Sequence, residues 1–88
     1  MHWVYRFDDR ALKDFEKLGR PAQRNILSYL DSRISGSDDP RRFGKALKSN
    51  LAGLWRYRIG DYRLVCQIVD RDLLVLIVTA GHRKDVYD

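Results

Sequence analysis

Three arginines share one face of a segment whose pattern predicts a β-hairpin. Two runs of alternating residues are joined by Gly60-Asp61, and a two-residue loop of this kind is a strong local hairpin signal. In that register Arg58 lies opposite Arg63, and Arg56 points to the same side. Like charges directly opposite each other on antiparallel strands are destabilising. A chain that keeps three arginines together at this cost is expected to use them to hold an anion.

The other face of the same hairpin is apolar and is expected to belong to the core. It carries Trp55, Tyr57, Ile59, Tyr62, Leu64, Cys66 and Ile68. Cys66 is the single cysteine of the chain, so we expect a buried core residue and neither an intrachain disulfide nor a cysteine-based metal site. The lack of disulfides is typical of proteins in a reducing cytoplasm.

Basic charge is concentrated around this hairpin. Residues 41–63 contain seven basic residues and one acidic residue, which gives +6 for the segment and −1 for the remainder of a chain whose formal net charge is +5. A local basic patch interleaved with aromatic residues is typical of a protein with a nucleic-acid or phosphate partner. Most charge runs are solvated faces without a ligand. That alternative stays open, although alternation with core aromatics on strands favours the ligand.

An N-terminal strand and two helices are predicted before the basic segment. Residues 2–7 alternate as a strand does, and Asp8 or Asp9 can cap a short helix that is closed by Gly19. Pro21 suits the first turn of a second helix. The expected buried positions are Ala11, Leu12, Phe15 and Leu18 in the first helix and Ala22, Ile26, Leu27, Leu30 and Ile34 in the second.

Three further strands are predicted, at about 54–59, 62–69 and 73–80. The expected fold is therefore α+β, a single small domain over residues 1–88 with the order β-α-α-β-β-β. Two N-terminal helices should pack on one face of a mostly antiparallel four-stranded sheet and leave the face with the arginines open. Residues 1–7 lack the apolar run of a signal peptide, and the longest apolar run, 73–78, is too short to cross a bilayer.

Several runs of the sequence belong to a known pattern. They are Phe7-Asp8-Asp9-Arg10-Ala11-Leu12-Lys13, Phe43-Gly44-Lys45-Ala46-Leu47-Lys48, Gly53-Leu54-Trp55-Arg56-Tyr57-Arg58-Ile59-Gly60-Asp61-Tyr62-Arg63 and Gly81-His82-Arg83-Lys84-Asp85-Val86-Tyr87. As a set, spread over nearly the whole chain, they resemble the RelE toxins of the RelE/ParE superfamily of bacterial toxin–antitoxin systems. The fold of that superfamily, a compact sheet with two N-terminal helices, agrees with the predicted order. RelE members are ribosome-dependent endoribonucleases that cut mRNA in the decoding (A) site and arrest translation.

The resemblance implies roles for five residues. Arg56 and Arg58 fall where RelE proteins carry basic residues that bind the RNA backbone and stabilise the charged transition state. Arg63 matches the arginine that holds the scissile phosphate, and Arg83 matches a second catalytic arginine at the leaving oxygen. Tyr87 matches the C-terminal tyrosine proposed as general base and stacking group. Further contacts with RNA or the ribosome are expected from Arg41, Arg42, Lys45, Lys48 and Lys84.

The implied reaction is attack by the ribose 2′-hydroxyl on its own 3′-phosphate, which needs neither a metal ion nor another cofactor if cations stabilise the phosphorane. Arginine stays protonated at neutral pH, and tyrosine ionises only near pH 10, so neither is an ideal acid or base. Surrounding arginines would favour the phenolate of Tyr87. Histidine is better suited to proton transfer, but strand alternation points His82 away from the face of Arg83 unless a bulge at Gly81 re-aims it. A structural role is therefore favoured for His82.

The resemblance also implies partners. We expect a cognate RelB-like antitoxin that is acidic or partly disordered, and the ribosome and mRNA as targets in the cytoplasm. Operator DNA is expected to be bound only through the toxin–antitoxin complex, because no helix here has the pattern of a recognition helix, and no membrane partner is expected. The main alternative is a ParE-type toxin, which inhibits DNA gyrase by binding. Such members generally lack the set Arg56, Arg58, Arg63, Arg83 and Tyr87.

Arg63 also allows an expectation about stability. Its aliphatic stem should lie on the sheet, directly opposite Arg58. Removal of Arg63 is therefore expected to relieve repulsion and leave the fold intact or slightly more stable, while most cleavage is lost.

Overall fold

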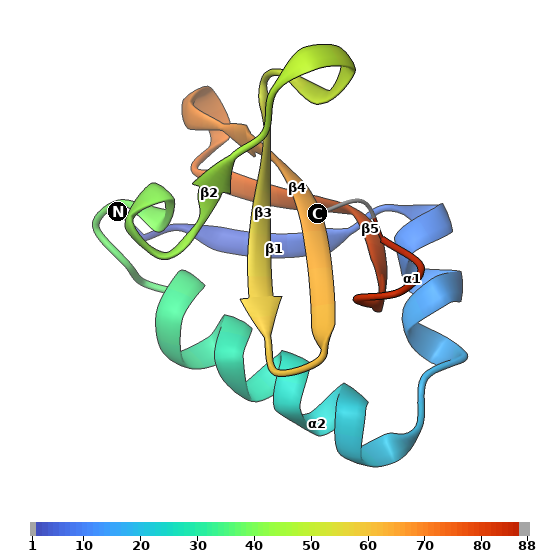
Figure 1. Cartoon of the computed structure of the whole chain (residues 1–88). Helices are drawn as coiled ribbons and strands as arrows, with labels where there is room; N and C mark the ends of the chain where they lie inside the picture. The colour runs from blue at the N-terminus through green and yellow to red at the C-terminus, as the bar shows by residue number, and fades with distance from the viewer. Residues whose placement is uncertain (1, 87–88) are drawn as a thin grey trace.

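The predicted hairpin forms the middle of a five-stranded sheet in the computed structural model, which describes residues 2–86. The strands are β1 (Val4–Phe7), β2 (Lys45–Ala46), β3 (Leu54–Ile59), β4 (Tyr62–Val69) and β5 (Leu74–His82), in the spatial order β1-β5-β4-β3-β2 (Figure 1). β1 and β5 pair in parallel, and all other neighbours are antiparallel. The α+β class and the mostly antiparallel sheet are thus confirmed.

The number of strands differs from the prediction of four. Lys45 and Ala46, which lie outside every predicted strand, pair with Arg56 and Trp55 and extend the sheet beyond β3. A strand of two residues is too short to show alternation, so periodicity alone does not reveal it.

Two helices cover one face of the sheet, α1 (Asp9–Glu16) and α2 (Arg20–Tyr29), and α2 continues into a π-helical turn at Leu30–Ile34 (Figure 1). Asp8 caps α1, because its side chain accepts a hydrogen bond from the Ala11 N–H at 2.8 Å. α2 has Pro21 in its first turn, as predicted. Gly19, which was predicted to close the first helix, is instead the N-cap residue of α2, and α1 ends at Glu16 with Lys17 as its C-cap. Within the described residues, no helix is long and apolar enough to cross a membrane.

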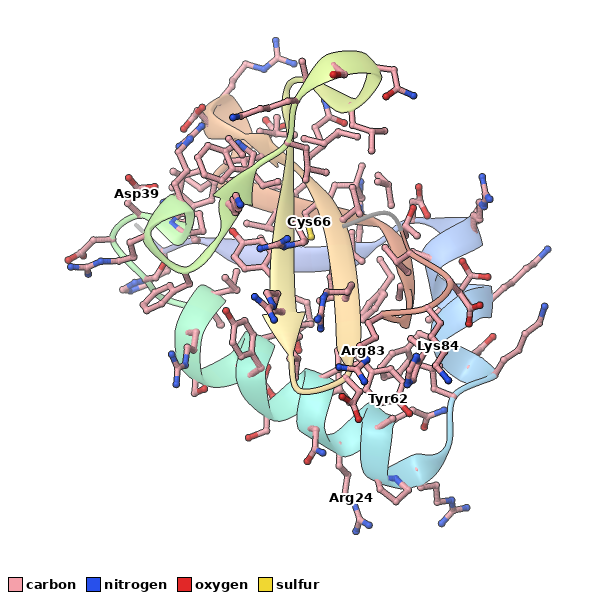
Figure 2. The ribbon with its side chains drawn as sticks, viewed as in Figure 1. Arg24, Asp39, Tyr62, Cys66, Arg83 and Lys84 are labelled. Atoms are coloured by element: carbon pink, nitrogen blue, oxygen red, sulfur yellow. The ribbon has the colours of Figure 1, made fainter. Side chains whose placement is uncertain are left out.

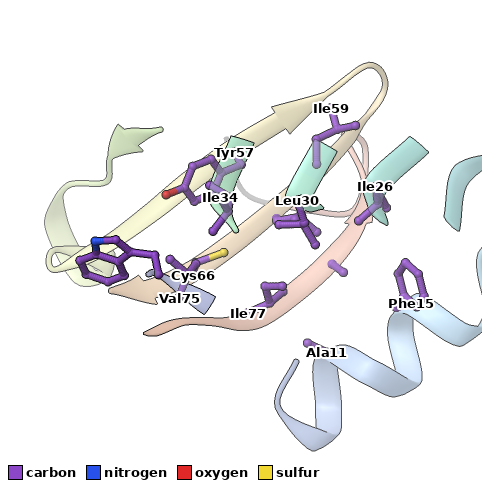
Figure 3. Packing of buried hydrophobic residues seen from close by; sticks show 13 residues of the cluster. Ala11, Phe15, Ile26, Leu30, Ile34, Tyr57, Ile59, Cys66, Val75 and Ile77 are labelled. Atoms are coloured by element: carbon purple, nitrogen blue, oxygen red, sulfur yellow. The ribbon is translucent and has the colours of Figure 1, made fainter. Parts of the chain in front are cut away.

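The main core lies between these helices and the apolar face of the hairpin (Figure 3). Its fully buried members are Ala11, Ile26, Leu30, Ile34, Tyr57, Leu64, Cys66, Val75 and Ile77. The predicted apolar face is therefore confirmed, with Trp55, Tyr62 and Ile68 packed at its margin. Burial raises the pKa of the Cys66 thiol, so this side chain stays neutral.

Two predicted core positions are wrong. Leu12 is 42% exposed and Leu27 is 36% exposed. Each follows a fully buried residue, Ala11 or Ile26. One residue further along an α-helix turns the side chain by about 100°, which carries both leucines away from the sheet.

A bulge in β5 changes which side chains face the helices. Val65 pairs with Thr79 but Cys66 pairs with Ile77, so Val78 is an extra residue. Val78 packs on the side of the sheet that carries the arginines. Beyond it, alternation resumes with the opposite phase, and this fixes the directions of the last residues of the strand.

Candidate anion-binding site

Arg56, Arg58 and Arg63 form an arginine face on the side of the sheet opposite the helices. Arg58 pairs directly with Arg63, and Gly81 of β5 completes that row. In a neighbouring row Lys45 of β2 pairs with Arg56. The predicted register is therefore confirmed. The short strand β2 adds one more cation, Lys45, to the face.

Two of these arginines are buried. Arg56 is 9% exposed and Arg63 only 3%, whereas Arg58 is exposed. A buried charge is costly unless hydrogen bonds compensate it, and Arg63 Nη1 donates to the carbonyls of Gly60 and Tyr62 at 2.9 Å each. The hairpin loop thus fixes the guanidinium of Arg63. Because Arg63 is buried and hydrogen-bonded, we expect its removal to destabilise the fold, and not to leave it intact or more stable.

A second apolar cluster lies on this face. It consists of Leu47, Val65 and Val86, and Val65 lies directly opposite Arg56 in the strand register. Val86 reaches the cluster because the chain turns back after β5, and Gly81 makes room for it. A Cβ atom at Gly81 would lie 3.0 Å from the Val86 Cγ2. Alternation in the sequence gave no signal for this role of Val86, because it follows the last strand.

Arg83 lies just after β5, next to the hairpin loop. Its backbone N–H donates to the Asp61 carbonyl at 2.7 Å, and its Nη1 is 3.7 Å from the Asp61 Oδ1. Both side chains are more than half exposed, so this ion pair is weak. Figure 2 shows Arg83 and Lys84 near the loop end of β4. Tyr87 lies outside the described residues, and its place at the site stays a prediction.

His82 faces the helix side of the sheet. It pairs with Tyr62, and the two rings meet edge to face with their centroids 5.6 Å apart. Its Nδ1 accepts a hydrogen bond from the Lys84 N–H at 3.2 Å. The bulge lies at Val78 and not at Gly81, so nothing in the described strand turns His82 toward the arginines. This arrangement favours the structural role.

Arg41, one of the predicted RNA contacts, is paired with acidic side chains. Its guanidinium donates to both carboxylate oxygens of Asp70, at 2.9 and 2.6 Å, and lies 3.5 Å from the Asp39 Oδ1. It also lies over the Trp55 ring, 5.8 Å from the centroid. The hydrogen bonds from Arg41 lower the pKa of Asp70. A phosphate would have to displace a carboxylate to bind here. Arg42, Lys45, Lys48 and Lys84 are exposed.

Features for other kinds of site are sparse. Among residues 2–86, no group of three or more His, Cys, Asp or Glu side chains could hold a metal ion. An open pocket of about 430 Å³ is lined by Arg20, Gln23, Arg24 and Leu27 of α2, on the helix side (Figure 2 labels Arg24). Gln23 has a structural use there, because its side-chain amide donates to three carbonyls at the end of α1. The pocket is therefore separate from the arginine face.

Comparisons with known proteins identify relatives across nearly the full chain. A family model described as the ParE toxin of the type II toxin–antitoxin system parDE matches residues 5–87. Toxin RelG of Mycobacterium tuberculosis is 33% identical over 99% of this chain and 98% of its own. The mRNA interferase toxin RelE of Escherichia coli is 27% identical over 96% of this chain and 86% of its own. A chain in the crystal structure of the toxin–antitoxin complex RelBE2 from Mycobacterium tuberculosis matches with a TM-score of 0.85 and 31% identity, covering 94% of this chain and 100% of that one.

Proposed function

The chain belongs to the RelE/ParE superfamily of type II toxin–antitoxin toxins, and we propose that it is a ribosome-dependent endoribonuclease that cuts mRNA in the decoding site. The observation that carries this proposal is the gathering of Arg58, Arg63 and Arg83 around one hairpin loop. Arg56 adds a further cation on the same face. The similarity to a relative named mRNA interferase supports the same class of reaction.

In the proposed reaction the ribose 2′-oxygen forms a bond to the adjacent phosphorus, and the bond from phosphorus to the 5′-oxygen breaks. The products are a 2′,3′-cyclic phosphate and a free 5′-hydroxyl. Arg63 would hold the scissile phosphate, and Arg83 would stabilise the leaving oxygen. Arg56 and Arg58 would neutralise the charge that develops on the phosphorane. Preorganised cations at developing charge are usually the largest catalytic contribution, and the fixed guanidinium of Arg63 fits this requirement.

Proton transfer explains why the ribosome would be needed. A protonated guanidinium stabilises charge but does not accept the proton of the 2′-hydroxyl. The phenolate of Tyr87 is the proposed acceptor and becomes the phenol, and the proton reaches the 5′-oxygen from Arg83 or from water. With no strong base supplied by the arginines, the reaction would depend on a ribosome that holds the 2′-oxygen in line with the leaving oxygen. Such orientation contributes several kcal/mol.

A cognate antitoxin is part of the proposal. The similarity to a chain solved in a toxin–antitoxin complex supports such a partner. We expect an acidic, partly disordered segment that folds on this chain and covers the arginine face or displaces Tyr87. Operator DNA would be bound by the complex and not by the toxin alone. Action on translating ribosomes would take place in the cytoplasm.

Inhibition of DNA gyrase is the second candidate, because the family model that matches is described as ParE. The two functions differ in what happens to the target. A nuclease leaves new RNA ends, whereas a gyrase inhibitor blocks supercoiling and leaves mRNA intact.

A translation extract with a reporter mRNA separates these functions. Primer extension should show cuts in phase with codons when the protein is added, and gyrase supercoiling should be unaffected. Naked RNA should be cut far more slowly than mRNA on programmed ribosomes. Arg6→Ala is the matched control, because Arg6 is an exposed arginine on the edge strand β1, where it pairs with Leu76 of β5. Intact mRNA together with blocked supercoiling would establish the gyrase alternative.

A further inference from the structure

We propose that Asp61 is a positioning residue that holds Arg83 in a fixed place relative to Arg63, so that both guanidinium groups address one phosphate. This inference rests on the proposed function of the arginine face. Asp61 does not touch the reacting atoms in this proposal and acts only through Arg83.

The hairpin loop contacts both arginines from adjacent residues. The Gly60 carbonyl accepts from Arg63 Nη1 at 2.9 Å, and the next carbonyl along the chain, that of Asp61, accepts from the Arg83 N–H at 2.7 Å. The Asp61 carboxylate adds a contact to the Arg83 guanidinium, 3.7 Å from Oδ1 to Nη1. One short loop therefore sets the separation between the two cations.

The charge of Asp61 supports a use beyond the turn itself. Gly60 has φ +58°, the conformation that a tight hairpin loop demands, and asparagine would serve as well as aspartate in such a loop. Asp61 is the single acidic residue between positions 41 and 63. A negative charge beside a phosphate site weakens phosphate binding, so its presence there calls for another role. Restraint of a long, flexible arginine is such a task, because a free side chain of this type loses much rotamer entropy when it is fixed.

The test isolates the carboxylate from the backbone bond. In Asp61→Asn the loop and the carbonyl that receives the Arg83 N–H are kept, and the ion pair is lost. We expect the order parameter of the Arg83 Nε–H group, measured by nitrogen-15 relaxation, to fall in Asp61→Asn. With programmed ribosomes kcat should fall about two- to fivefold, the range that an exposed ion pair supports, while KM and the melting temperature stay close to wild type. Asp61→Glu should recover part of the order and of kcat.

Asp72→Asn is the matched control, because Asp72 is also an exposed turn residue, with its Oδ1 4.0 Å from the Arg71 Nε. It should change neither the Arg83 signal nor kcat. An unchanged Arg83 order parameter in Asp61→Asn would overturn the proposal, and so would a kcat equal to or above that of wild type. If the wild-type chain cuts no ribosome-bound mRNA, the nuclease function fails, and the relaxation data still decide whether Asp61 restrains Arg83.

Discussion

Arg63→Ala tests stability and catalysis in one variant, and the structure gives a magnitude for each. The substitution removes Nη1, which donates to two carbonyls, and a stem buried on the sheet. A hydrogen bond from a charged group contributes about 1.5–3 kcal/mol, and we count both bonds as one because they share a donor. Two buried methylene groups add about 1.6 kcal/mol. Relief of the repulsion from Arg58 returns less than about 1 kcal/mol.

The variant should therefore lose about 2–4 kcal/mol of unfolding free energy, which corresponds to a fall in melting temperature of roughly 8–30 °C for a domain of this size. Small domains are stable by about 5–15 kcal/mol, so most molecules remain folded at low temperature. Cleavage per folded molecule should fall about a hundred- to thousandfold, as when one preorganised donor to a developing charge is removed.

The assay pairs thermal unfolding with cutting of ribosome-bound mRNA on the same preparation, at a temperature well below the variant's transition. Arg63→Lys keeps the charge and much of the stem, so its stability loss should be smaller than that of Arg63→Ala. Its cleavage should still fall clearly, because an ammonium group cannot make the forked contact of a guanidinium. Near-normal cutting per folded Arg63→Ala molecule would refute the proposed site. An unchanged melting temperature would refute the reasoning from burial and hydrogen bonds.

Three further predictions concern the scaffold. Tyr57→Phe removes a buried hydroxyl that donates to the Pro40 carbonyl at 2.8 Å and should lower the unfolding free energy by about 1–2 kcal/mol in denaturant unfolding. An unchanged free energy would mean that water replaces the lost hydrogen bond. Asp70→Asn removes the pair with Arg41; because that pair lowers the pKa of Asp70, its stabilisation is present above pH 3.8 and is lost in stronger acid. The melting temperatures of wild type and Asp70→Asn should thus differ near neutral pH and converge in acid, once the pH falls below the lowered pKa of Asp70, and a constant gap would contradict this. Gly81→Ala places a Cβ 3.0 Å from the Val86 Cγ2 and should lower stability by about 1–3 kcal/mol, whereas an unchanged value would mean that Val86 yields freely.

The hairpin could be predicted almost residue by residue, because its signals are local. The bounds of β3 and β4 and the pairing of Arg58 with Arg63 follow from alternation and from one loop of two residues. The cap of α1 at Asp8 and the proline in the first turn of α2 are equally local, since each acts on its immediate neighbours.

The parts that the sequence did not reveal depend on contacts between distant residues. Arg41 was predicted to contact RNA, but its guanidinium is hydrogen-bonded to Asp70, which lies 29 residues away in the sequence. Val86 joins the apolar cluster on the arginine face, and it has no periodic signal that would announce this because it follows the last strand. The bulge at Val78 reflects the packing of two clusters on opposite faces, which no single strand encodes.

The two faces of the sheet show why the cations are better explained by function than by stability. On the helix face, buried apolar residues such as Leu64 and Ile77 stabilise the fold by packing together in one core. On the arginine face, Arg58 and Arg63 oppose each other although an acidic residue in either position would stabilise the pair. The loop then fixes Arg63 through the carbonyls of Gly60 and Tyr62, so its guanidinium is held at a defined place on this face. A cation held at a defined place is what stabilisation of a transient phosphorane requires.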